Sequence, residues 1–214
     1  MTVDPSTKRK RGNTRRRLID AAFEAYAENG FGHTTVEKVV DRAGFTRGAF
    51  YSNFESLEEL FLEMWAERSS TILAEIRTAL DRLVADDVVD LREVIRGISA
   101  ALPLDPKWWG ITAEVTAHAL RTPGLREVVA AREEHVSEAL TPLVVELLAR
   151  AGRRIPDPES FSKAVIAVFD GTAPQCLLNP DDDQVLERRR VLFEHIALAY
   201  SVPDDSAAAL AVEV

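Results

Sequence analysis

The chain has 214 residues, a length that fits one domain or two small ones. Hydrophobic residues make up 46% of it and charged residues 29%, the proportions of an ordinary globular protein, so wholly disordered and collagen-like classes are excluded. The net charge of −9 argues by itself against a nucleic-acid partner, because DNA repels an acidic surface.

The apolar runs of the sequence are short. Residues 164–169 form one of the longest, far below the roughly 20 residues that a membrane-spanning helix needs. No apolar stretch follows the basic N-terminus before Leu18, so we expect no signal peptide, no membrane partner and a cytoplasmic protein. The single cysteine, Cys176, cannot form an internal disulfide and is expected to be a small buried hydrophobic side chain.

Charge is distributed unevenly along the chain. Residues 1–54 carry 10 Lys and Arg against 6 Asp and Glu, whereas the remaining residues carry 16 against 29. Seven of the ten cations form an N-terminal cluster: Lys8, Arg9, Lys10, Arg11, Arg15, Arg16 and Arg17. Such a basic arm can bind phosphates, although a solvated tail has the same composition.

Helical periodicity dominates the sequence and indicates an all-α fold. A flexible arm is expected over residues 1–12. Three short helices are predicted next, beginning at the capping residues Asn13 or Thr14, Thr34 or Thr35, and Thr46, and ending at Gly30, Gly44 and Phe54.

The remaining sequence predicts one long helix and five further helices. The long helix follows the capping residue Ser56 and stays in phase for about 27 residues, roughly 40 Å, which can link two domains. Pro and Gly breaks divide the rest into helices over about 88–101, 106–120, 124–151, 158–178 and 183–200. Pro174 should bend or break the fourth of these, and the chain after Ser201 is expected to fray.

Residues 34–54 have the helix, glycine turn and second short helix of a helix-turn-helix, which places its second helix in the DNA major groove. Gly44 permits a left-handed turn, and three apolar residues can pack the two helices together: Val40, Phe45 and Phe50. Gly48 and Ala49 let the backbone approach bases closely, and Arg47 should point outward. Similar helical hairpins occur in proteins that bind no DNA, so this pattern is only moderately specific.

The wider sequence is more specific. Thr34-Thr35-Val36, the run from Asp41 to Phe54 and the segment Ser56-Leu57-Glu58-Glu59-Leu60 resemble the N-terminal signature of the TetR family of bacterial transcriptional regulators. The motif covers about residues 14–61, and the rest resembles the family in helix number and length and in the Glu114–Leu125 stretch. The resemblance implies an N-terminal three-helix helix-turn-helix DNA-binding domain over 13–55, a C-terminal helical ligand-binding and dimerisation domain over 56–201, and a frayed tail over 202–214.

The resemblance also implies which residues contact DNA. Thr35, Tyr51 and Asn53 are expected to bind backbone phosphates, and five residues are expected to lie against base edges: Thr46, Arg47, Gly48, Ala49 and Ser52. Independently of any family, arginine suits bidentate pairing with guanine, and the alanine methyl group suits the methyl group of thymine. A core position is the alternative for Tyr51.

One departure from the family concerns the start of the long helix. The family usually has a lysine there, whereas this chain has Leu57 preceded by Glu55, so one phosphate contact is missing. The basic arm, including Arg11 and Arg15, could compensate by following the DNA backbone or entering the minor groove.

A single recognition helix reads only a few base pairs, so we expect a homodimer with half-sites about 34 to 36 Å apart. In the family, the last two helices form a four-helix bundle with their symmetry mates. The candidate interface residues on these helices are Phe161, Val165, Val168, Leu186, Leu192, Phe193 and Ile196. Packing in the monomer's own core is the alternative for each of them.

The central helices carry a largely apolar face with a hydroxyl and an imidazole, as small-molecule sites do. The resemblance places an effector site among these helices, and the candidate residues are Trp108, Ile111, Thr112, Val115, His118 and Phe169. Core packing is the more common role of such a face. Asp170 and Glu114 would favour a cationic effector. An effector that prefers a state with misplaced recognition helices lowers DNA affinity, and the long helix could connect the two sites.

Two other classes of protein are alternatives to a DNA-binding regulator. For an enzyme, the sequence offers no HExxH motif, no phosphate-binding glycine loop and no recognisable nucleophile, so no catalytic residue, metal or cofactor is predicted. The second alternative is an α-helical binding or scaffolding module without a DNA role. The favoured prediction is a TetR-type regulator, by family default a repressor, that binds a palindromic double-stranded operator as a homodimer and is released by a small-molecule effector.

Overall fold

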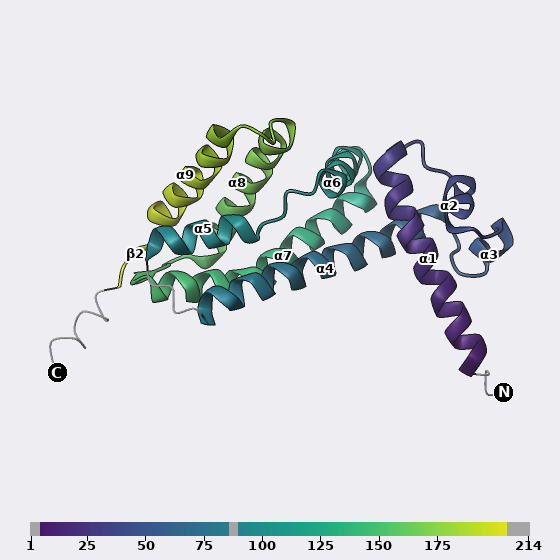
Figure 1. Ribbon diagram of the computed structural model, residues 1–214, viewed down its shortest axis with the longest axis horizontal. Helices are drawn as coiled ribbons and strands as arrows, with labels where there is room; N and C mark the ends of the chain where they lie inside the picture. The colour runs from purple at the N-terminus through teal and green to yellow at the C-terminus, as the bar shows by residue number, and fades with distance from the viewer. Residues whose placement is uncertain (1–4, 86–89, 205–214) are drawn as a thin grey trace. The chain divides into compact units, whose positions relative to one another are not determined.

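The computed structural model describes residues 5–85 and 90–204, and for residues 5–11 and 84 it describes the backbone alone. These ranges are almost entirely helical, which confirms the predicted all-α fold (Figure 1). The helices are α1 (Pro5–Asn29), α2 (Val36–Ala43), α3 (Arg47–Tyr51), α4 (Leu57–Ala85), α5 (Leu91–Ala101), α6 (Pro106–Ala119), α7 (Pro123–Arg150), α8 (Pro158–Leu178) and α9 (Asp183–Tyr200). None of them combines the length and the apolar character that crossing a bilayer requires.

Local side-chain chemistry explains where many of these helices begin and end. Five N-cap side chains accept a hydrogen bond from a backbone N–H of the first turn: Thr35, Thr46, Asp90, Asp157 and Asp182. Three loops contain a glycine with positive φ: Gly30, Gly44 and Gly152. Left-handed backbone of this kind is the usual way to end a helix, and glycine adopts it without a steric penalty.

The N-terminal arm differs from the prediction. Helix α1 begins at Pro5 rather than near Asn13, so the segment expected to be a flexible arm is helical from that proline onward. Proline suits the first position of a helix, and the Lys and Arg residues that follow are good helix formers, which the choice of a later capping residue overlooked. Residues 1–4 lie outside the described ranges.

The C-terminal half differs from the prediction at two places. Of the bend or break expected at Pro174, the break is absent, because α8 continues through this residue to Leu178. The tail does not fray directly after Ser201: β2 (Val202–Pro203) pairs antiparallel with β1 (Arg153–Arg154), and the Asp204 N–H donates to the Gly152 carbonyl at 2.9 Å. Residues 205–214 lie outside the described ranges.

The chain divides into two compact units. The first comprises residues 1–71 and 107–122, and therefore groups α6 with α1, α2, α3 and the beginning of α4. The second comprises residues 72–106 and 123–214, with the end of α4 and the helices α5, α7, α8 and α9. The predicted limits of functional domains stay a prediction.

An aromatic cluster packs helices of the first unit together. The Phe31 ring lies 4.8 Å from the ring of Phe61 and 5.1 Å from that of His118, measured between centroids. Tyr26 packs edge-on against Phe61 at 4.9 Å, and its hydroxyl donates to the Leu57 carbonyl at 3.3 Å. Burial raises the pKa of Tyr26, which therefore stays a neutral donor. The cluster joins α1, α4 and α6.

In the second unit, α8 and α9 lie side by side, α9 also packs on α5, and α8 packs on α7 (Figure 1). The interior is formed by fully buried side chains that include Val94, Leu147, Leu148 and Phe193. Cys176 is a free, buried thiol, as predicted. The interior of the second unit also contains a charged residue, Arg189, which is only 2% exposed.

Candidate nucleic-acid interface

The turn between α2 and α3 is held by a backbone hydrogen bond and by an arginine of α1. Gly44 has φ 70° and ψ 37°, and the Phe45 N–H donates to the Val40 carbonyl at 2.9 Å. From α1, Arg17 donates to the Ala43 carbonyl at 2.7 Å and lies over the Phe45 ring at 4.7 Å. An arginine at the end of a helix satisfies free carbonyls and suits the negative pole of the helix dipole. Arg17 thus has a structural role that its place in the basic cluster did not reveal.

The five residues of α3 divide between an inner and an outer face. Phe50 is 0% exposed and packs at 5.9 Å from Phe54, which is also buried. Tyr51 is 53% exposed, which excludes the alternative of a core aromatic. Thr46, Arg47, Gly48 and Ser52 are exposed as well, and Ala49 is half-buried. The residues predicted to face bases therefore lie together on an accessible surface, and their contacts with DNA stay a prediction.

Gly48 is not required by the packing of the chain. A Cβ atom added there would meet only the Thr46 hydroxyl oxygen, at an ordinary distance of 3.7 Å. The residue has no positive φ that would favour glycine. A glycine in an exposed helix normally lowers stability relative to alanine, so its presence on this surface is consistent with a close approach of another molecule.

Arg47 is held by two neighbours. Its guanidinium lies 3.0 Å from the Glu37 carboxylate, and both side chains are more than half exposed. A hydrogen bond to Tyr51 and the charge of Glu37 raise the pKa of Arg47. Hydrogen bonds from its own backbone N–H and from the Thr35 hydroxyl, with the charge of Arg47, lower the pKa of Glu37. Glu37 thus contacts two residues predicted to bind DNA, although no sequence motif pointed to it.

Two of the predicted DNA contacts, Asn53 and Arg15, are less accessible. Asn53 is 9% exposed, and its amide nitrogen donates to the Ala49 carbonyl at 2.8 Å and to the Ser52 hydroxyl at 3.2 Å. Arg15 lies over the Phe54 ring at 4.2 Å, donates to the Asn53 carbonyl and pairs with Glu63. A phosphate contact by either residue would require these bonds to be exchanged. The side chain of Arg11 lies outside the described residues.

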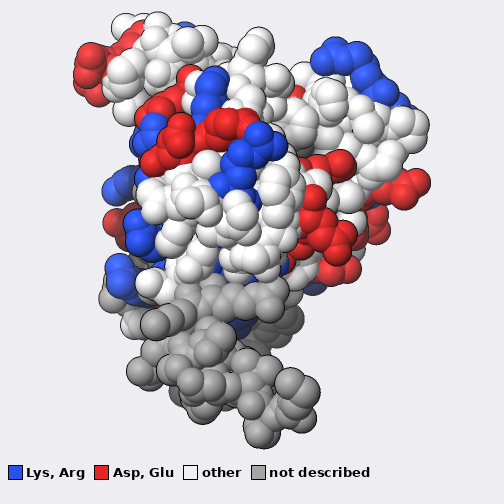
Figure 2. All heavy atoms as spheres, turned by 90° about the vertical axis from the view of Figure 1, so that its right-hand side faces the viewer, with Lys and Arg blue, Asp and Glu red and all other residues white. Residues whose placement is uncertain are grey.

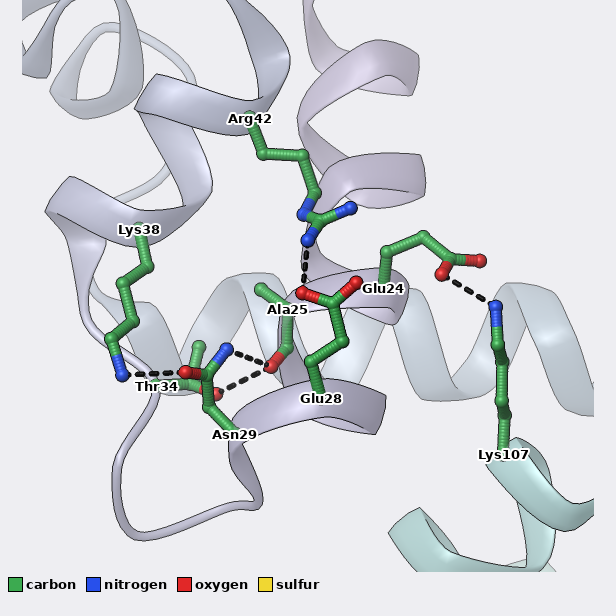
Figure 3. A network of polar contacts seen from close by, with 8 residues as sticks. All are labelled: Glu24, Ala25, Glu28, Asn29, Thr34, Lys38, Arg42 and Lys107. Carbon is green, nitrogen blue, oxygen red and sulfur yellow. Dashed lines mark hydrogen bonds and ion pairs between the residues drawn. The ribbon is translucent and has the colours of Figure 1, made fainter.

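A polar network ties α2 to the end of α1 (Figure 3). Lys38 donates to the Asn29 side chain at 2.6 Å, and Arg42 forms an ion pair with Glu28. The Thr34 hydroxyl lies 3.2 Å from the Ala25 carbonyl that it bonds. Several cations near the helix-turn-helix are therefore paired within the chain. On the side of the molecule drawn in Figure 2, Lys and Arg side chains lie close to Asp and Glu side chains.

Helix α6 forms an ion pair with α1 and a hydrogen bond with the turn that follows α1. Glu114 accepts a hydrogen bond from the Phe31 N–H at 2.5 Å, and Lys107 pairs with Glu24 of α1 at 2.6 Å (Figure 3). A Cβ atom added at Gly30, which has φ 78°, would lie 2.8 Å from a carboxylate oxygen of Glu114. The turn before α2 is thus built around the Glu114 carboxylate, a contact across 83 positions of sequence that no local pattern could reveal.

Five of the predicted effector residues lie on α6 in the first unit, among them Thr112, and the sixth lies on α8. Trp108, Ile111 and Val115 are buried in the first unit, whereas His118 is exposed and lies against the Phe31 ring. Phe169 belongs to the second unit. An effector role for any of these residues stays a prediction.

A cavity lies elsewhere, inside the second unit. It is lined by apolar side chains of α4, α5, α7 and α8 and of Leu102, and by three hydroxyls, those of Ser137, Thr141 and Ser162. The volume of the cavity is about 40 Å³. Ser137 and Thr141 are four residues apart on one face of α7, a signal that the sequence analysis missed.

The predicted interface residues fall into three groups by exposure. Phe161 and Phe193 are buried within the unit, and Val165 lines the cavity, so for these three the alternative of the monomer's own core is observed. Leu186 and Leu192 are exposed. Val168 and Ile196 are half-buried. The dimer contact itself stays a prediction.

Arg189 of α9 is a buried cation with few partners. One guanidinium nitrogen donates to the Thr172 hydroxyl at 3.0 Å, and the group lies 5.1 and 5.2 Å from the rings of Phe169 and Phe193. The other terminal nitrogen has no hydrogen-bond partner in the described part of the chain. Burial lowers the pKa of Arg189. Over the same residues, no group of side chains has the composition of a metal site.

Two family models match the chain. The model described as bacterial regulatory proteins, tetR family, matches residues 18–64, which include α2 and α3. The model described as BetI-type transcriptional repressor, C-terminal, matches residues 88–200, more than half of the chain. The chain belongs to the TetR family. The matched models and relatives describe transcriptional regulators.

Some curated TetR-family relatives match only the N-terminal part of the chain, and others match most of it. A probable acrEF/envCD operon repressor of Escherichia coli (strain K12) is 41% identical over 64 residues, which are 30% of this chain. That match spans 29% of the relative's own length. The probable HTH-type transcriptional regulator ArpR of Pseudomonas putida is 29% identical over 188 residues, 84% of this chain and 88% of the relative.

Solved TetR-family structures share the fold. A putative TetR-family regulator from Mesorhizobium loti MAFF303099 has a TM-score of 0.71 at 17% identity and covers 89% of this chain and 96% of its own. A putative transcriptional regulator from Saccharomonospora viridis, solved in complex with choline, has a TM-score of 0.64 at 17% identity. That similarity covers 89% of this chain and 98% of the other.

Proposed function

We propose that this TetR-family protein is a repressor that binds a palindromic operator as a homodimer in the cytoplasm and is released by a small-molecule effector. The observation that carries the DNA-binding part is the outer face of α3. It presents Arg47, Gly48 and Tyr51 to solvent while Phe50 anchors the helix in the core. A short helix held in this way can enter a major groove without rearranging its own support.

The proposed dimer follows from the small number of bases that one such helix can reach. Two copies related by twofold symmetry would read two half-sites, about 34 to 36 Å apart for one turn of DNA. Exposed apolar side chains on α9 support an interface there: Leu186, Leu192, Leu198 and Tyr200. Large apolar side chains that are exposed in the monomer can be buried by a symmetric partner.

The proposed effector site is the cavity between α4, α5, α7 and α8. An effector acts by binding better to one conformation than to another, and a cavity of about 40 Å³ must widen to admit anything larger than a few water molecules. Helix α4 supplies Leu80 to the cavity wall and is continuous with Leu57, whose carbonyl accepts the Tyr26 hydroxyl. One helix therefore links the cavity wall to a contact with α1.

Arg47 offers the sharpest test of operator binding. We expect R47Q to weaken binding to the cognate duplex by about tenfold or more while binding to a scrambled duplex changes little, since a lost base contact removes discrimination. R77Q is the matched control, because Arg77 is also exposed and has one carboxylate partner, Asp81 at 3.9 Å, in the second unit. Fluorescence anisotropy over a salt series, with fragments of the promoter of its own operon, measures both.

Three results would contradict the proposal. If R47Q and R77Q reduce the affinity for cognate DNA equally, the face of α3 does not read sequence. A monomer in sedimentation at operator-binding concentrations would exclude paired half-sites. If the wild-type protein binds no promoter fragment at low salt, a helical binding or scaffolding module without a DNA role becomes the better description.

A further inference from the structure

The cavity in the second unit has a composition that selects its ligand. Thirteen residues line it, of which ten are apolar and three carry hydroxyls. Phe161 supplies its one aromatic ring among the residues that the structure describes, and no lining residue is ionisable. The chemistry of the wall is therefore that of hydrocarbon with a small polar spot.

The polar spot has a limited capacity for hydrogen bonds. The Thr141 hydroxyl donates its proton to the Ser137 carbonyl at 2.6 Å. The hydroxyl oxygens of Ser137 and Ser162 lie 2.7 Å apart, so one donates to the other. Each hydroxyl has a single proton, which leaves one serine proton uncommitted, together with acceptor lone pairs. This spot can satisfy one hydroxyl or carbonyl of a ligand.

A charged ligand does not suit such a wall. Transfer of an ion from water into an apolar site is strongly unfavourable unless an opposite charge or several hydrogen bonds receive it. A quaternary ammonium group cannot donate hydrogen bonds and is bound in proteins by several aromatic rings or by carboxylates. One phenyl ring and three hydroxyls offer too little to replace its hydration.

We propose that the effector bound in this cavity is an uncharged, mainly apolar molecule with a single hydroxyl or carbonyl group, which takes over the hydrogen bond between Ser137 and Ser162. The proposal rests on the proposed function, because it assumes that this cavity is the effector site. Since Ser137 belongs to α7 and Ser162 to α8, the exchange also removes a bond that holds these two helices together. Binding and widening of the cavity are thereby coupled.

A pair of ligands with one shape and different charge tests the proposal. Choline and 3,3-dimethylbutan-1-ol share a hydroxyl and three methyl groups, and differ in a central nitrogen cation or a neutral carbon. We expect the alcohol to raise the melting temperature and to release promoter DNA, with a dissociation constant at least tenfold lower than that of choline. A larger pair, 4-phenylbutan-1-ol and 4-phenylbutylamine, repeats the comparison with more apolar surface.

The serine pair provides the matched variants. S137A with S162A should weaken binding of both alcohols severalfold, measured by titration of the protein without DNA. S70A is the control, because Ser70 is an exposed serine on α4 outside the cavity. If the double variant binds the alcohols as tightly as wild type and has the same melting temperature, the two serines are not part of the ligand site.

The outcomes separate this inference from the function on which it rests. Stronger stabilisation and DNA release by choline or the amine would overturn the neutral class and leave an effector-controlled regulator standing. The same holds if neither alcohol binds while the wild-type protein binds its promoter. Absence of promoter binding before any ligand is added would count against the proposed function itself.

Discussion

The face of α3 and the interior of the second unit treat polar groups in opposite ways. On α3 the charged group, Arg47, is exposed and held by Glu37, a partner that a DNA molecule can replace. In the second unit the polar groups lie among packed side chains: half-buried Ser137 and buried Ser162 bond each other, and buried Arg189 has one nitrogen without a hydrogen-bond partner in the described part of the chain. Exchange at the surface requires little rearrangement, whereas any change inside must move packed helices. The first region suits fast recognition and the second a conformational response.

The largest difference that we predict concerns two glycines of the first unit. G30A should lower the free energy of unfolding by about 1 to 3 kcal/mol, because alanine is strained at positive φ and its Cβ would displace the Glu114 carboxylate from the Phe31 N–H. G48A is the control, since its Cβ meets only an ordinary contact. Chemical denaturation measures both variants.

The two glycines should separate stability from recognition. We expect G48A to match or slightly exceed wild-type stability and yet to weaken operator binding, because the added methyl group lies on the surface proposed to meet bases. If G48A binds the operator as tightly as wild type, that surface is farther from the DNA than proposed. A G30A variant as stable as wild type would mean that the turn can relax around Glu114.

A smaller effect of opposite sign is expected in the second unit. R189M should raise the free energy of unfolding by about 1 to 2 kcal/mol, because it replaces a buried, incompletely partnered cation with an apolar chain of similar length. Denaturation of R189M and of the conservative variant R189K, at several protein concentrations, measures the effect. Destabilisation of R189M that grows as the protein is diluted would instead show that a second copy supplies the missing partner.

The sequence predicted the first region better because its signals are local. Thr46 as a cap, Gly44 as a left-handed turn and Phe50 as the inward residue follow from spacing and propensity over a few positions, and all three were confirmed. Helix limits in the second half followed equally from Pro and Gly breaks. The start of α1 was predicted wrongly. Asn13 and Thr14 are suitable N-cap residues, but the helix begins at Pro5, because proline also suits the first position of a helix.

The candidate sites that were missed depend on contacts between distant positions. Glu114 bonds the turn at Phe31, and Ser162 meets Ser137 only after α7 and α8 pack together. The apolar face of α6 predicted a pocket, but the same pattern describes a helix buried in a core, and Val115 is fully buried. Periodicity shows which face of a helix is covered and does not show what covers it.

The smallest effect that we predict is at Glu37. It tests whether this carboxylate competes with DNA for Arg47 or orients Arg47 toward DNA. In the free protein, this carboxylate accepts from the Thr35 hydroxyl and pairs with Arg47, the two kinds of group that we expect to meet DNA. A phosphate or a guanine would compete with it for the same donors. We therefore expect E37Q to tighten promoter binding by a factor of about two to five, with stability within about 0.5 kcal/mol of wild type, the range usual for surface substitutions.

The pH dependence of the same pair gives an independent measurement. Because the pKa of Glu37 is lowered, its contribution is complete above its ordinary pKa and is lost only as the pH falls through the lowered value. The ratio of E37Q to wild-type affinity should then be constant around neutral pH. E146Q is the control, because Glu146 is an exposed carboxylate of α7 in the second unit that pairs with an arginine, Arg150, at 3.2 Å. Weaker promoter binding by E37Q would mean that Glu37 orients Arg47 toward the bases, and the ion pair would then be part of the recognition surface rather than a competitor for it.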